Sequence, residues 1–167
     1  MSSKKIARIA ILAALAFVLR MAFSHLPNIQ PVTALFFIAT ITLSYYEAFL
    51  VMFISILLTS FLLGFGPWVF WQITTFTIIM AIWRFLIFPL SRKIKVYRML
   101  MQSLSVAFLA LLYGLMIDSC FAYLYSMPWW TYVLSGMTFN LLHALSTLIF
   151  YPVLLTLFRR LFNEKMV

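Results

Sequence analysis

The residues of this chain that could carry out chemistry are few, and they form no catalytic pattern. The three acids are Glu47, Asp118 and Glu164, the two histidines are His25 and His143, and the single cysteine is Cys120. Their spacing offers neither a carboxylate pair for general acid–base catalysis nor a histidine pair for a metal. No stretch of the form G-x-x-x-x-G-K-[ST] occurs, which excludes nucleotide hydrolysis through a P-loop. We therefore expect a non-catalytic chain that binds no metal and no cofactor itself.

Polar and aromatic side chains gather instead around three short loops, at about 24–32, 64–68 and 125–131. These loops read SHLPNIQPV, GFGPW and YSMPWWT, and their prolines restrict the backbone. The candidate binding residues at these loops are Asn28, Gln30, Trp68, Trp71, Gln72 and Tyr125. Amides and indoles on a stiff loop suit a flat organic ligand that forms hydrogen bonds. An aromatic belt at the membrane surface is the plainer explanation, and it would account for the tryptophans alone.

Four more polar residues lie inside apolar stretches, where a hydrocarbon environment makes them costly. They are Arg20, Asp118, Asn140 and His143, and the last two share one helix face at spacing i, i+3. We expect all four to converge beneath the three loops and to contribute to the same binding site. A buried ion pair between Arg20 and Asp118 and a structural, hydrogen-bonded His143 are the alternatives.

The elements that position these residues must lie in lipid. The chain has 167 residues, of which 66% are hydrophobic and 9% charged, and its mean hydropathy is +1.10. Soluble domains carry roughly 25% charged residues, so a water-soluble globule is excluded. Apolar segments run over about 6–23, 33–46, 48–63, 69–90, 99–124 and 132–158. A single helix over 33–63 would be about 46 Å long, beyond a hydrocarbon core of roughly 30 Å, which favours two helices turning near Tyr45-Tyr46-Glu47.

The positive charges predict how this bundle is oriented. Twelve Lys and Arg oppose three acids, for a net charge of +9. With six helices, ten basic residues fall on one side: Lys4, Lys5, Arg8, Arg92, Lys93, Lys95, Arg98, Arg159, Arg160 and Lys165. The three opposite loops have none, whereas a five-helix arrangement would break the positive-inside rule. We predict an all-α membrane protein: one integral membrane domain over 1–167, a six-transmembrane-helix bundle with both termini cytoplasmic. The basic excess then reflects orientation and not nucleic-acid binding, and the first apolar segment is a retained helix, not a cleaved signal peptide.

The first helix carries small residues at helical spacing. Ala7, Ala10 and Ala14 would give it a smooth strip that another helix could approach closely. The strip could serve a partner subunit or packing within this bundle.

Two loop strings give the chain a family likeness. PNIQPVTAL at 27–35 and GFGPWVFWQ at 64–72 resemble the substrate-binding S-components of energy-coupling factor (ECF) vitamin transporters, in the subgroup associated with cobalamin or related precursors. The resemblance implies a non-catalytic subunit that binds cobalamin or a related corrinoid on the extracellular side of the cell membrane. It also implies a separate transmembrane scaffold, on which Ala7, Ala10 and Ala14 would pack, and two ATPase subunits that use ATP and Mg. Delivery would follow from the S-component tipping over in the membrane, in a Gram-positive bacterium.

Other functions remain open at this point. An S-component for a queuosine precursor or another small vitamin is the nearest alternative. An intramembrane transferase would need clustered acids or a metal site, and a secondary transporter would usually show an inverted repeat with broken helices. The sequence has none of these features.

Overall fold

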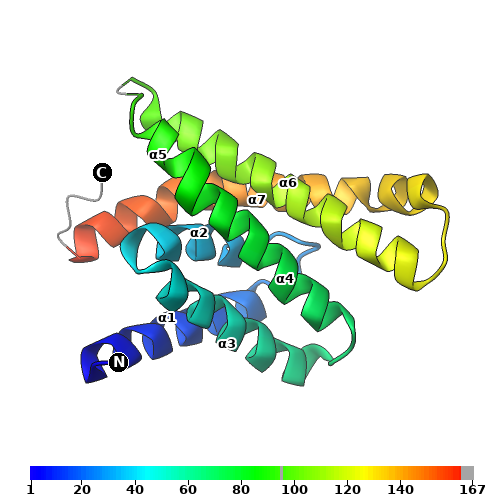
Figure 1. The fold of residues 1–167 in the computed structure, drawn as a ribbon, viewed down its shortest axis with the longest axis horizontal. Helices are drawn as coiled ribbons and strands as arrows, with labels where there is room; N and C mark the ends of the chain where they lie inside the picture. The colour runs from blue at the N-terminus through cyan, green and yellow to red at the C-terminus, as the bar shows by residue number, and fades with distance from the viewer. Residues whose placement is uncertain (95, 163–167) are drawn as a thin grey trace.

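The computed structural model describes residues 1–94 and 96–162, with side chains described through residue 160, and its regular structure in these ranges is entirely helical. In chain order the elements are α1 (Ser3–Ala22), α2 (Val32–Thr42), α3 (Tyr45–Leu63), α4 (Trp68–Ala81), the π-helical η1 (Ile82–Ile87), α5 (Phe88–Ser91), α6 (Arg98–Leu124) and α7 (Trp129–Phe162). Because α4, η1 and α5 follow without a break, they form one continuous rod (Figure 1). Lys95, Glu164 and Lys165, which entered the charge argument, lie outside the described residues.

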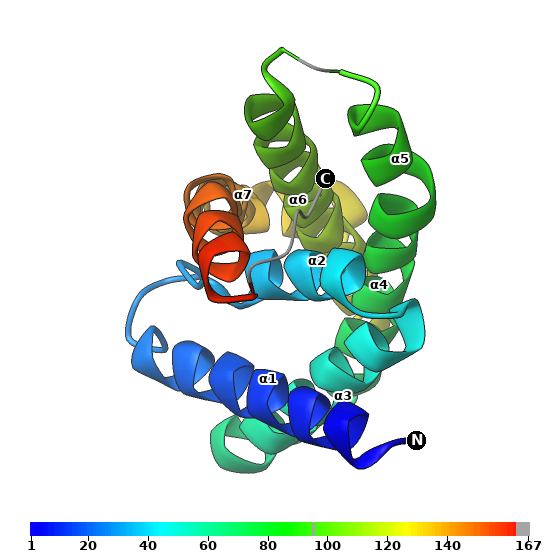
Figure 2. The same ribbon diagram turned by 90° about the vertical axis from the view of Figure 1, so that its left-hand side faces the viewer.

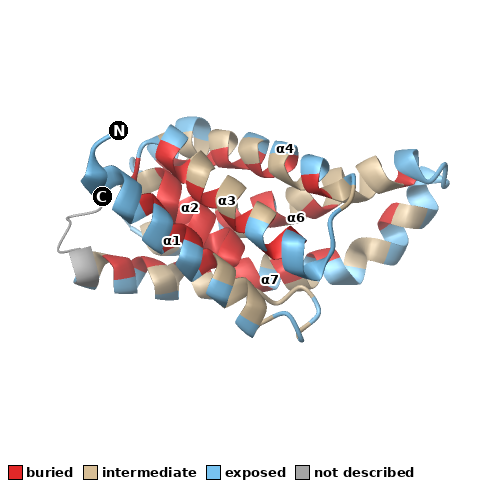
Figure 3. Ribbon diagram, turned by 90° about the horizontal axis from the view of Figure 1, so that it is seen from below, coloured by how far each residue is buried: buried red, intermediate tan, exposed pale blue. Residues whose placement is uncertain are grey.

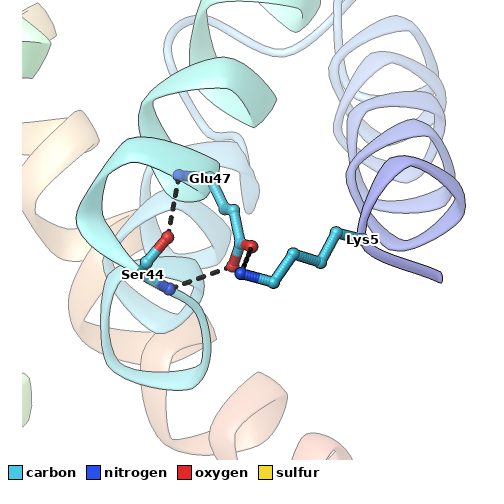
Figure 4. A network of polar contacts seen from close by, with 3 residues as sticks. All are labelled: Lys5, Ser44 and Glu47. Atoms are coloured by element: carbon cyan, nitrogen blue, oxygen red, sulfur yellow. Dashed lines mark hydrogen bonds and ion pairs between the residues drawn. The ribbon is translucent and has the colours of Figure 1, made fainter. Parts of the chain in front are cut away.

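The helices occupy the six apolar segments expected from the sequence, with one boundary displaced. The turn between α2 and α3 lies at Leu43 and Ser44, ahead of the predicted Tyr45-Tyr46-Glu47. The cause is a capping box: the Glu47 backbone N–H donates to Ser44 Oγ at 3.3 Å, and the Ser44 N–H donates to Glu47 Oε2 at 3.2 Å. Lys5 Nζ lies 3.0 Å from Glu47 Oε1, which joins α1 to the start of α3 (Figure 4).

Within the described residues, four helical stretches are long and apolar enough to cross a membrane: Tyr45–Leu63, Trp68–Ser91, Arg98–Leu124 and Trp129–Arg160. The helix α2 is apolar but has only 11 residues, about 16 Å, too short to span a core of roughly 30 Å alone. Basic residues near both ends distinguish α1 from the four long helices. The count of six membrane spans and the cytoplasmic termini therefore stay predictions.

The short helix α2 forms the centre of the fold. It contacts α1, α3, α4, α6 and α7, and it lies between them in the end-on view (Figure 2). Nine of its eleven residues are buried, among them Phe36 and Phe37. The Phe37 ring meets Trp83 edge-on at 5.9 Å, and Trp83 meets Tyr151 of α7 in the same way at 5.7 Å. This aromatic core fixes the helices that surround the candidate site.

The paired helices α6 and α7 extend beyond the rest of the bundle at one end (Figure 1). Burial is concentrated where they flank α2, and their projecting end is mostly exposed (Figure 3). The exposed residues there include the aromatic side chains of Tyr123, Tyr125 and Trp130. Such side chains are typical of the interface between hydrocarbon and water.

Candidate functional site

A half-open cavity of about 420 Å³ lies among the end of α1, the α1–α2 loop, α2, α4, α6 and α7. Seven of the binding residues expected from the sequence line it: Arg20, Asn28, Gln30, Gln72, Asp118, Asn140 and His143. Residues from five helices and one loop thus meet at a single hollow. The expectation that Arg20, Asp118, Asn140 and His143 converge agrees with this placement.

Three residues expected at the site do not line the cavity. Trp71 is 36% exposed on the outside of α4, and Tyr125 is 56% exposed near the end of α6. Trp68 packs against the core, and its ring lies over Gly66 in the preceding loop. An aromatic residue near a loop can face lipid, core or ligand, and the spacing of Trp68 and Trp71 did not distinguish these.

The cavity has an aromatic wall that the sequence reasoning missed. The additional lining residues are Val32, Thr33, Phe76, Tyr113, Gly114, Ile117, Phe121, Tyr132 and Phe139. The Phe76 and Tyr113 rings lie 4.2 Å apart with an interplanar angle of 31°, and Tyr113 meets His143 edge-on at 5.4 Å. In an apolar chain these rings look like ordinary core residues, and only the crossing of α4, α6 and α7 reveals a shared surface.

Two glycines make room for the polar pair of the cavity. Asn140 Nδ2 donates a hydrogen bond to Asp118 Oδ2 at 2.6 Å, across the contact between α6 and α7. A Cβ at Gly114 of α6 would collide with the Asn140 side chain, and a Cβ at Gly136 of α7 would collide with the Asp118 carboxylate. Each glycine therefore leaves a notch in its helix, one turn before the polar residue of that helix. The polar side chain of the other helix fills this notch. The spacing Gly114-x-x-x-Asp118 and Gly136-x-x-x-Asn140 carried this signal in the sequence.

His143 and Arg20 line another part of the cavity. His143 Nε2 lies 2.7 Å from Thr33 Oγ1, whereas His143 Nδ1 is buried without a hydrogen-bond partner. Arg20 Nε is also buried and unpaired. The ion pair between Arg20 and Asp118 that the sequence left open is not formed, since Lys5–Glu47 is the ion pair present among the described side chains.

A family model for the substrate-specific component of ECF transporters matches residues 4–155. The chain belongs to this family. Comparison with curated proteins and with solved structures gave no match. Together with the apolar helices, the match makes this chain the membrane-embedded, substrate-binding subunit of an ECF transporter. Subunits of this kind work with a scaffold and ATPase subunits and are generally non-catalytic.

In this S-component the loop between α1 and α2 is tied to α7 beside the cavity. Asn28 has a left-handed backbone (φ 57°), and its Nδ2 donates to the Phe139 carbonyl at 3.0 Å. The Gln30 N–H donates to Ser146 Oγ at 2.9 Å, and Ser146 Oγ donates to the Gln30 carbonyl at 3.0 Å. Some hydrogen-bonding groups of the PNIQP segment, the Asn28 amide and the Gln30 backbone, thus hold the loop against α7.

The alanines of α1 in the S-component divide between two faces. Ala7, Ala10 and Ala14 are exposed, whereas Ala13 and Ala16 are buried. Ser55 of α3 donates a hydrogen bond to the Ala13 carbonyl at 3.3 Å, so the buried face packs on α3. The strip of Ala7, Ala10 and Ala14 is therefore not consumed by packing within the chain.

Proposed function

We propose that this S-component captures a small, flat organic nutrient in the cavity between α6 and α7 on the extracellular side. The scaffold subunit and two ATPases then drive its import as the S-component tips over in the membrane. The observation that carries the proposal is one cavity that combines an aromatic wall with the seven polar side chains expected from the sequence. This chain would bind no cofactor, because ATP and Mg are used by the ATPase subunits.

The size of the cavity favours a compact ligand. Its volume of about 420 Å³ lies in the range of roughly 300–1,000 Å³ that is typical of sites for drug-sized molecules. A bicyclic heteroaromatic compound, such as the deazapurine of a queuosine precursor or another small vitamin, would fit inside and stack on Phe76 and Tyr113.

Cobalamin is the second candidate, and its support is the likeness of 27–35 and 64–72 to the cobalamin-type S-components. The amides of Gln30 and Gln72 on the cavity wall suit the amide groups of a corrinoid. A whole corrinoid is larger than the cavity, so only one edge of it would enter.

The exposed alanine strip supports the proposed docking on the scaffold. Small side chains let two helix backbones approach closely in a membrane, where packing drives association. Ala7, Ala10 and Ala14 would form this contact, and none of the three lines the polar cavity.

The proposal is tested by purifying the protein in detergent from cells grown in rich medium and identifying the bound compound by mass spectrometry. The compound should then accumulate in vesicles only when the scaffold, both ATPases and Mg-ATP are present. A deazapurine or similar bicycle would support the first candidate, and a corrinoid the second. Accumulation without the partner subunits would contradict the ECF mechanism.

A further inference from the structure

The cavity contains hydrogen-bonding groups that the described part of the protein leaves unpaired. Arg20 forms no hydrogen bond or ion pair there, and its Nε is buried. His143 is 4% exposed, and its Nδ1 is buried without a partner. Burying polar groups without partners is costly, and a buried charge without a counter-charge is more so. Both side chains line the same cavity, so a ligand there could supply the missing partners.

A hydrogen-bond acceptor, the Asp118 carboxylate, lies at another point of the cavity wall. Asp118 accepts one hydrogen bond, from Asn140, and an ionised carboxylate has sites for several. The notches at Gly114 and Gly136 hold this pair at a fixed position between α6 and α7. The carboxylate therefore has spare capacity to accept hydrogen bonds from a ligand.

The positive and the negative group are kept apart. Arg20 and Asp118 form no ion pair, although both line one cavity. Arg20 interacts electrostatically with Tyr113 and His143. Asp118 instead accepts a hydrogen bond from Asn140 and interacts electrostatically with Tyr132. The aromatic surface of Phe76 and Tyr113 contributes a flat wall. The cavity thus presents a donor end, an acceptor end and a stacking surface.

We infer that the ligand is a small aromatic molecule with opposite polarity at its two ends: a carboxylate or similar anionic oxygen meets Arg20 and His143, and an amino group meets Asp118 and Asn140. This inference rests on the proposed function and names the class of its substrate. An Arg20–Asp118 ion pair would have made each group the partner of the other and left the ligand uncharged. Because Arg20 and Asp118 do not pair with each other, the ligand must offer a partner to each of them.

Two matched sets of probes test the inference by calorimetric titration of the purified, ligand-free protein. One set is pterin-6-carboxylate, pterin without the carboxylate and lumazine-6-carboxylate without the amino group. The other is 4-(aminomethyl)benzoate, 4-methylbenzoate and benzylamine. In at least one set, the member with both groups should bind about 10- to 100-fold more tightly than either analogue, the usual effect of a charged hydrogen bond.

Two variants test which residue binds the carboxylate of the ligand and which binds its amino group. Arg20→Gln should abolish the preference for the carboxylate and leave the preference for the amino group, whereas Asp118→Asn should do the reverse. Tyr123→Phe, at a side chain that is 85% exposed and outside the cavity, is the control and should change neither. Thermal unfolding of each variant checks that the fold is retained.

The inference is wrong if neither complete probe binds more tightly than its analogues, or if each variant weakens all members of a set equally. It is also wrong if complexes with Arg20→Gln and Asp118→Asn still import the compound identified by mass spectrometry at the unaltered rate. That last result would leave the proposed function standing. Failure of the chain to assemble with a scaffold, or to retain any compound, would instead contradict the proposed function.

Discussion

Asp118 and Asn140 show how single residues build this site. Each occupies the space left by a glycine on the facing helix, which places a hydrogen-bonded polar pair at the contact between two long membrane helices. Polar groups in hydrocarbon are expensive, and pairing them reduces that cost. The arrangement leaves carboxylate capacity for a ligand while keeping the side chains fixed.

The glycine notch can be tested at the same scale. Gly136→Ala introduces a Cβ that collides with Asp118 and must displace the carboxylate. We expect ligand affinity to fall about tenfold or more, although alanine is intrinsically favoured over glycine in a helix by about 1 kcal/mol. Titration of the purified variant measures this. Gly64→Ala is the control outside the cavity. A Cβ at Gly64 would contact no other atom, and the only strain comes from the backbone, which has φ 114°. Unchanged affinity in Gly136→Ala would show that the carboxylate position is unimportant.

At the residue scale the sequence located many of the cavity residues and missed others for a physical reason. Arg20, Asp118, Asn140 and His143 were conspicuous because hydrocarbon disfavours them. Phe76 and Tyr113 were hidden, since rings are common in any membrane helix. The free capacity of Asn28 was overestimated, because its amide donates to the backbone of α7.

At the scale of elements, α1 has two faces with different tasks. The buried face packs on α3, and the exposed strip of Ala7, Ala10 and Ala14 is available to a partner subunit. The alanine spacing predicted a smooth strip, but it could not tell which alanines faced outward. The orientation follows from contacts with α3, which are distant in sequence.

Substitutions on the two faces of α1 should therefore differ. Ala10→Trp should abolish uptake by the assembled complex while leaving ligand binding within about twofold, because the new ring obstructs close helix approach on the exposed face. Ala13→Trp, at a side chain that is 1% exposed, should instead overpack the α1–α3 contact and destabilise the protein by about 1–3 kcal/mol or more. Uptake, calorimetric titration and thermal unfolding separate the effects. Equal loss of binding in Ala10→Trp would place that alanine in the bundle.

The capping box at the start of α3 sets the boundary between α2 and α3. The sequence Ser44-x-x-Glu47 was its signal, whereas the turn expected from helix length, at Tyr45-Tyr46-Glu47, lies about two residues too late. Ser44→Ala should lower the free energy of unfolding by about 1 kcal/mol, the usual cost of losing such a cap. Lys5→Ala should cost less, because the lysine side chain is 57% exposed. Equal stability of Ser44→Ala and the unaltered protein in thermal unfolding would contradict the role of this cap.

At the scale of the whole molecule, the sequence predicted the positions of the helices well because each lies in a separate apolar segment. It could not predict that α2 would be enclosed by its neighbours, since that depends on how the other helices cross. The orientation in the membrane stays a prediction from the basic residues. The family supports the membrane location independently of hydropathy.

Cysteine labelling tests this orientation. In a Cys120→Ser background, cysteines at Phe65 and Met127 should react with an impermeant reagent from outside, and one at Tyr46 only after permeabilisation. All three positions are exposed, at 50%, 48% and 63%. Labelling of Tyr46→Cys in intact cells would contradict the predicted orientation or the predicted number of six spans.

The central claim is that the cavity between α6 and α7 holds the transported compound. Its most direct test is calorimetric titration of the compound identified by mass spectrometry into the ligand-free protein, as the unaltered chain, Asp118→Asn and Tyr123→Phe. We predict one site per chain, a loss of about 10- to 100-fold in affinity for Asp118→Asn, and no change for Tyr123→Phe. Equal affinity in all three proteins would contradict the claim and place the binding site elsewhere.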